Sequence, residues 1–93
     1  MAKIEIQQIV DLPEARFDIT VQDSTVTKHI ITLTQEYFQA LTAGAATPLE
    51  LIRASFEFLL AREPNTSILS AFDLKVISTY FPEYEREMKD KFR

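Results

Sequence analysis

Residues 47–62, TPLELIRASFEFLLAR, constrain the fold more strongly than any other stretch of this sequence. The start of this stretch is typical of a helix N-terminus, because the Thr47 hydroxyl and the Glu50 carboxylate can form a reciprocal capping box. Pro48 occupies the first helical position, where its missing N–H costs nothing. Pro64 disfavours a helical conformation at the residue before it, so we expect the helix to end near Arg62.

The apolar face of this expected helix is too wide for a surface helix. At about 100° per residue, its large apolar side chains cover roughly 200° of the circumference, whereas a surface helix needs only about 100°. The polar stripe that remains is narrow and contains Glu50, Arg53 and Glu57. The helix must therefore be covered on two sides. Its large apolar residues are Leu49, Leu51, Ile52, Phe56, Phe58, Leu59 and Leu60.

Three stretches before this helix alternate between apolar and polar residues, which predicts β-strands over 3–12, 16–22 and 27–33. In the first stretch, Gln8 and Ile9 interrupt the alternation. The interruption indicates a bulge or a short strand. The pattern leaves open whether this first strand joins the sheet.

The register between the second and third strands depends on the loop that joins them. A two-residue loop at positions 23 and 24 would place the apolar rows of the two strands on opposite faces. A loop of three or five residues places Phe17 on the same face as Ile31. Because a slip of one residue turns every side chain to the other face, we predict the odd-length loop.

The remaining segments favour helices. Thr34 and Asp73 are N-cap candidates, and Gly44, the only glycine, fits a left-handed position at a helix C-terminus. Residues 68–72 are interpreted as one helical turn. The other expected helices cover residues 34–43, 74–81 and 82–92.

These elements predict one α+β domain over residues 1–93. Strands in residues 1–33 form a two- or three-stranded antiparallel sheet that packs on the central helix, and residues 34–93 are helical. The sheet covers one side of that helix, and the C-terminal helices cover the other. The hydrophobic fraction of 46% is ordinary for a globular chain that buries a core.

Composition excludes several classes of function. The chain has no cysteine, which excludes disulfides, thiolate zinc sites and cysteine nucleophiles. The net charge of −4 argues against a general affinity for nucleic acid or anionic membranes. The first residues lack the apolar core of a signal peptide, and no apolar run approaches the roughly 20 residues of a membrane span. We therefore expect a soluble cytoplasmic protein without cofactor or metal.

Few residues suggest catalysis. His29 is the only histidine, and no cysteine or second histidine could share a metal with it, so we interpret it as a half-buried strand residue. Glu50, Arg53 and Glu57 share a helical face, which is more typical of a solvated ion-pair stripe than of an acid–base pair. No G-x-S-x-G or S-x-x-K motif is present. We expect a protein that is not an enzyme.

An aromatic group near the C-terminus is the best candidate for a site. The chain has three tyrosines and seven phenylalanines, enough to fill a small core without all of them. Our hypothesis is that Tyr80, Phe81, Tyr84 and Phe92 form an apolar patch that binds a protein partner or a second copy. The alternative is that these residues clamp the C-terminal helix onto the domain.

Two segments resemble known proteins. Residues 29–63, HIITLTQEYFQALTAGAATPLELIRASFEFLLARE, resemble a ribbon-helix-helix repressor module. This resemblance implies a strand over 30–33 that pairs with its twin in a dimer and enters the major groove of DNA. The alternative function is therefore a DNA-binding transcriptional regulator or antitoxin.

The second resemblance carries no mechanism. Residues 56–85, FEFLLAREPNTSILSAFDLKVISTYFPEYE, resemble a group of short bacterial proteins with no assigned activity, and the likeness spans most of the chain from Phe17 onward. The resemblance implies a standalone domain. Taken together, the sequence predicts a small non-catalytic domain that acts through protein contacts, with a second copy among the candidate partners and no membrane association.

Overall fold

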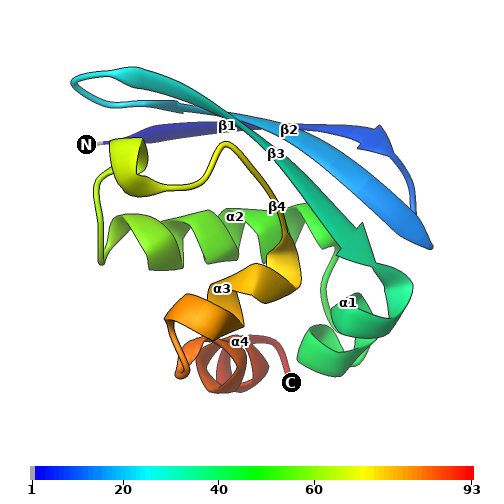
Figure 1. Cartoon of the computed structure of the whole chain (residues 1–93). Helices are drawn as coiled ribbons and strands as arrows, with labels where there is room; N and C mark the ends of the chain where they lie inside the picture. Colours follow the sequence, from blue (N-terminus) through cyan, green and yellow to red (C-terminus); the bar gives the residue numbers. More distant parts are fainter. Residues whose placement is uncertain (1) are drawn as a thin grey trace.

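Over residues 2–93, the computed structural model of the protein has a four-stranded β-sheet that lies on one side of a layer of helices (Figure 1). The strands follow one another across the sheet in the order β1-β2-β3-β4. The first three are antiparallel, and β4 pairs with β3 in the parallel direction. The strands are β1 Lys3–Val10, β2 Glu14–Gln22, β3 Val26–Thr34 and β4 Ala71–Asp73.

This architecture confirms the predicted α+β class but corrects the predicted sheet. The sheet is mixed, because residues 71–73 add a parallel strand where the sequence predicted a helical turn over 68–72. The backbone N–H of Ile30 donates to the Ser70 carbonyl at 2.8 Å, and the Thr32 hydroxyl donates to the Asp73 carboxylate at 2.8 Å. A strand this short is too brief to show alternation, so its position depends on contacts with β3 rather than on local sequence.

The register of the first three strands agrees with the prediction. Phe17 lies opposite Ile31, and Gln22 lies opposite Val26, which leaves a three-residue loop between β2 and β3. The apolar rows of both strands therefore face the helices. The expected bulge is present as a register shift between Gln8 and Val10, and β1 joins the sheet beside β2.

The helical segments begin at the predicted capping residues. Thr34 accepts a hydrogen bond from the Tyr37 N–H at 3.1 Å, and Thr47 and Glu50 form the capping box. Residue 74 starts a 3-10 helix, so the predicted helix over 74–81 is divided in two. The helices are α1 Gln35–Thr42, α2 Pro48–Leu60, α3 Ile77–Tyr80 and α4 Tyr84–Phe92, with the 3-10 helices η1 Asn65–Ser67 and η2 Leu74–Val76.

Two helix ends differ slightly from the expectation. Helix α2 ends at Leu60 rather than near Arg62. The C-cap of α1 is Ala43, with a left-handed φ of 51°, and Gly44 follows with φ of 77°. The left-handed turn therefore extends over both residues, and glycine takes the second position rather than the cap itself.

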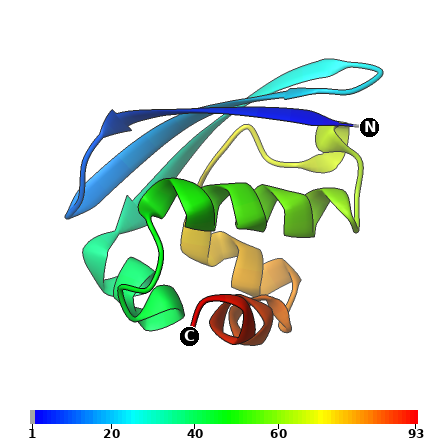
Figure 2. The ribbon, with the colours of Figure 1, turned by 180° about the vertical axis from the view of Figure 1, so that it is seen from behind.

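Helix α2 is the centre of the molecule. The sheet covers one of its sides, and α3 and α4 cover the other (Figure 1). Seen from behind, α2 lies next to β1 across one face of the molecule (Figure 2). Of its predicted apolar face, Leu60 is half-buried and Leu49 is 42% exposed, which corrects the expectation for that residue. The buried members are Leu51, Ile52, Phe56, Phe58 and Leu59.

Candidate protein-binding groove

The structure separates the predicted aromatic patch into two parts. Tyr84 is fully buried, and its hydroxyl lies 2.6 Å from the Ser55 hydroxyl of α2. Tyr84 therefore packs α4 onto α2, as the clamp alternative proposed, and it is not part of the surface. Phe92 is half-buried at the end of α4. Tyr80 and Phe81, in contrast, lie together at the edge of a groove.

The groove lies between the C-terminal end of α2, the segment 67–72 and α3. Its volume is about 270 Å³, and most of its lining is apolar. Leu69 and Tyr80 stand at the groove with 47% and 65% of their surfaces exposed. In Figure 1 the segment that leads from η1 into β4 passes above α2, and α3 lies below. The apolar residues that line the groove include Leu59, Ile68, Leu69, Phe72, Val76, Tyr80 and Phe81.

Glu63 gives the groove its charge. Of the described residues that line it, Glu63 alone carries a charged side chain. Within residues 2–93 this carboxylate has no ion pair and no hydrogen bond to another side chain. A half-buried carboxylate beside apolar surface attracts positive charge, so it favours a binding partner that carries a cationic group.

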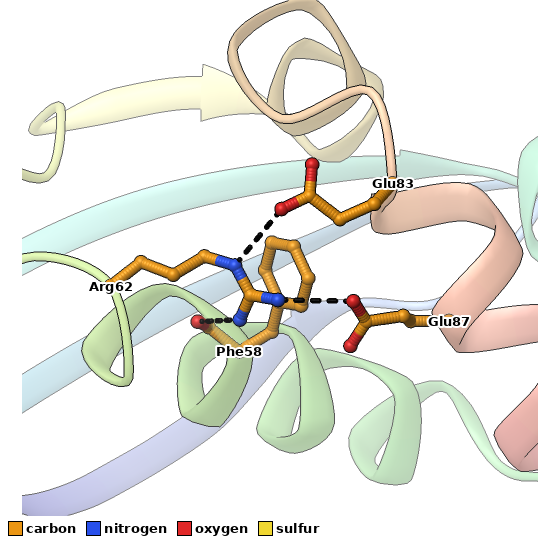
Figure 3. Close-up of polar contacts among 4 residues, drawn as sticks. All are labelled: Phe58, Arg62, Glu83 and Glu87. Atoms are coloured by element: carbon orange, nitrogen blue, oxygen red, sulfur yellow. Dashed lines mark hydrogen bonds and ion pairs between the residues drawn. The ribbon is translucent and has the colours of Figure 1, made fainter.

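Arg62 supports the lower wall of the groove without lining the groove itself, and Figure 3 shows its contacts. Its guanidinium donates to Glu83 at 3.2 Å, to Glu87 at 3.0 Å and to the Phe58 carbonyl at 3.0 Å. The same group lies 3.5 Å from the centroid of the Phe58 ring, which is a cation–π contact. The pKa of the Glu83 carboxyl is lowered by a hydrogen bond from the backbone N–H of Glu83 itself and by the nearby Arg62 guanidinium.

This Arg62 cluster holds the aromatic rings behind the groove. The Phe58 ring packs edge-on against Phe81 at 5.7 Å and against Tyr84 at 5.2 Å. Arg62 covers the Phe58 ring, and the Phe58 ring packs against Phe81, which lines the groove. Arg62 therefore helps to hold Phe81 in place through the Phe58 ring. Sequence reasoning missed this cluster. The one available signal was the spacing of Glu83 and Glu87, which places two carboxylates on one helical face.

The upper wall is held by buried polar residues of β3 and η1. The His29 Nδ1 donates to the Leu69 carbonyl at 2.7 Å, because a carbonyl can only accept, and Nε2 lies 2.9 Å from the Thr27 hydroxyl. Asn65 donates to the same hydroxyl at 3.0 Å and to the Thr25 carbonyl at 2.8 Å. His29 is 3% exposed, so it is buried rather than half-buried; its Nδ1 anchors the segment beside the groove, and its Nε2 contacts Thr27 of the same strand.

Two tyrosines attach α4 to the rest of the molecule. The Tyr37 hydroxyl of α1 donates to the Glu85 carboxylate at 2.9 Å. Burial, together with this hydrogen bond to a carboxylate, raises the pKa of Tyr37 above its usual value. Burial also raises the pKa of Tyr84. Both side chains are therefore neutral hydrogen-bonding groups that fix α4, and through it the Arg62 cluster.

Comparisons with family models, curated proteins and solved structures find no match for the chain. The ribbon-helix-helix resemblance implies that the strand over 30–33 has a free edge for its twin. In the structure that strand lies inside the sheet, between β2 and β4. Across residues 2–93, no three acidic or histidine side chains gather as a metal site, and no helix is long and apolar enough to cross a membrane.

Proposed function

We propose that the protein is a non-catalytic binding module whose groove takes an apolar side chain from a protein partner. The observation that carries this proposal is the exposure of Leu69 and Tyr80 beside a groove of about 270 Å³. Full burial of a large apolar side chain contributes about 1.5–3 kcal/mol, and these two side chains have roughly half of their surface left to bury. A partner that covers both would gain a useful part of its binding energy from them.

Charge narrows the class of partner. Glu63 is unpaired within the described part of the chain and lies beside apolar residues. A segment that places Lys or Arg next to its apolar anchor would pair with this carboxylate. We therefore propose a partner segment in which a large apolar residue is close to a basic one.

Preorganisation supports the same proposal. The Arg62 cluster fixes the lower wall, and the hydrogen bonds of His29 and Asn65 fix the upper one. A groove that is already formed loses little conformational entropy on binding. The resemblance of residues 56–85 to short bacterial proteins supports a standalone role for such a module.

Selection from a phage-displayed library of random peptides tests the proposal. We expect enrichment of peptides with a large apolar residue beside Lys or Arg. The substitution Leu69→Asp should weaken binding of the selected peptide by tenfold or more, because it places a charge in the groove. Leu49→Asp is the matched control, since Leu49 is a similarly exposed leucine outside the groove lining.

The proposal is contradicted if no peptide is enriched. It is also contradicted if the selected peptides bind Leu69→Asp and Leu49→Asp equally well. Circular dichroism of both variants verifies that neither substitution has unfolded the domain.

A further inference from the structure

The outer edge of β1 is a second interaction surface. Among the described residues, β1 pairs only with β2, so the other edge of Lys3–Val10 has no neighbouring strand. The backbone N–H and C=O groups on this edge can pair with another strand. This edge lies at the end of the sheet opposite β4, and of the described groove residues Glu63 alone also lines the depression beside it.

Apolar side chains lie beneath the β1 edge. Ile4 and Ile6 are half-buried and belong to the row that faces the helices. Ile4 and the half-buried Leu60 of α2 line the same depression between strand and helix. A strand added to β1 would therefore bury apolar surface as well as form backbone hydrogen bonds.

The charges on α2 are self-complementary. Arg53 and Glu57 are exposed on α2, and within residues 2–93 neither takes part in an ion pair. Figure 2 shows β1 and α2 running in opposite directions across one face of the molecule. A two-fold axis through this face would place Arg53 of each copy near Glu57 of the other. The occupant that fits both the edge and these charges is a second copy of the chain.

We infer that β1 pairs antiparallel with β1 of a second copy, around a two-fold axis at Ile6. The two sheets then become one continuous sheet, with the helices of both copies on the same side. Such an interface is isologous, because the same surface contributes from both copies.

The register follows from elementary strand geometry. Backbone groups alternate between the two edges of a strand, so residues that face each other must have the same parity, and the axis must pass through a residue. An axis at Glu5 would place two glutamates opposite each other, which is unfavourable. The bulge after Gln8 limits pairing to the residues before it. An axis at Ile6 pairs Ile4 with Gln8 and Glu5 with Gln7, without like charges.

The helix charges support the same axis. A strand advances about 3.3 Å per residue and a helix about 1.5 Å. Ile4 lies beside Leu60, and α2 runs in the opposite direction to β1. The step from Ile4 to Ile6 therefore corresponds to about four residues of α2, counted back from Leu60. The axis then passes close to residue 56, between Arg53 and Glu57 and within about one residue of their midpoint. An axis at Ile4 would instead bring Glu57 near the Glu63 of the second copy.

Single-cysteine variants test the pairing, because the chain has no cysteine of its own and any disulfide must join two copies. An antiparallel pair at the axis has Cα atoms about 4.5–5.5 Å apart, within the range of a disulfide. We expect Ile6→Cys to cross-link under mild oxidation much faster than Ile4→Cys, Glu5→Cys or Gln7→Cys. We also expect light scattering to give the wild-type protein twice the chain mass of 10.7 kDa.

A charge exchange provides a second test that does not alter β1. Arg53→Glu or Glu57→Arg alone should weaken the dimer about fivefold or more, and the double variant should restore it. The inference is overturned if the wild type has the monomer mass at all concentrations, or if cross-linking is equal at the four positions or greatest away from Ile6. It is also overturned if the double variant is as weak as the single ones.

Discussion

Arg62 is the residue with the most varied contacts in this structure. Its guanidinium contacts two carboxylates, one carbonyl and one aromatic ring. Its side chain is 27% exposed, so these contacts are partly shielded from water. Arginine suits this position because its planar group can bind carboxylates along its edge and an aromatic ring on its face at the same time. The compact ammonium of lysine has three donors but no planar group, so it could not bind both carboxylates and cover the ring face together.

We therefore predict that Arg62→Ala lowers the free energy of unfolding by about 1–3 kcal/mol, because two charged hydrogen bonds and a ring contact are lost. Arg62→Lys should recover only a small part of this loss. Urea denaturation followed by circular dichroism measures both values. Arg86→Ala is the control, since Arg86 is exposed on α4 and forms no ion pair within residues 2–93. Equal losses for Arg62→Ala and Arg86→Ala would contradict this role of the Arg62 cluster.

At the scale of elements, the parts that could be predicted are those with local causes. Helix α2 has its capping box and Pro48 at its start, and the loop between β2 and β3 follows from the parity of the apolar rows. β4 could not be predicted, because it depends on a partner far away in the sequence. The sequence left the burial of Tyr84 open between the patch and the clamp, since its partner Ser55 is also distant in the sequence. Of the site, the sequence indicated Tyr80 and Phe81, but Leu69 and Glu63 enter it through the path of the chain after α2.

The attachment of α4 gives a prediction about alkaline unfolding. Tyr37 and Tyr84 have raised pKa values in the folded protein, so above about pH 10 the unfolded chain ionises while the folded one stays protonated. The unfolded state then binds fewer protons, and stability falls as pH rises, by about 1.4 kcal/mol per pH unit for each tyrosine. Below about pH 10 this contribution is fully present.

Tyr84→Phe should therefore reduce the steepness of the loss above about pH 10 by roughly half. Tyr80→Phe, at a 65% exposed position, is the matched control and should leave the steepness unchanged. Urea denaturation at a series of pH values between 9 and 11 measures the slope. The same slope in the wild type and in Tyr84→Phe would contradict the burial of this hydroxyl in the folded state.

At the scale of the whole molecule, the two proposed surfaces lie at opposite edges of the sheet. The groove lies beyond β4, and the dimer edge is β1. Helix α2 connects them, since Leu59 lines the groove and Leu60 lies beside Ile4. A dimer joined through β1 would contain two identical grooves, one in each copy, and Glu63 is the groove residue closest to the interface, since it also lines the depression beside Ile4. Two grooves on one dimer would strengthen binding to a partner that carries two matching segments.

Chemical-shift mapping by NMR tests the proposed groove most directly. The protein is labelled with ¹⁵N and titrated with a peptide selected from the library. We expect the amides with large shifts to belong to Glu63, to residues 67–72 and to residues 76–81, while the amides on the open face of the sheet stay unchanged. Large shifts on that open face or along β1, with the amides of Leu69 and Tyr80 unmoved, would contradict it.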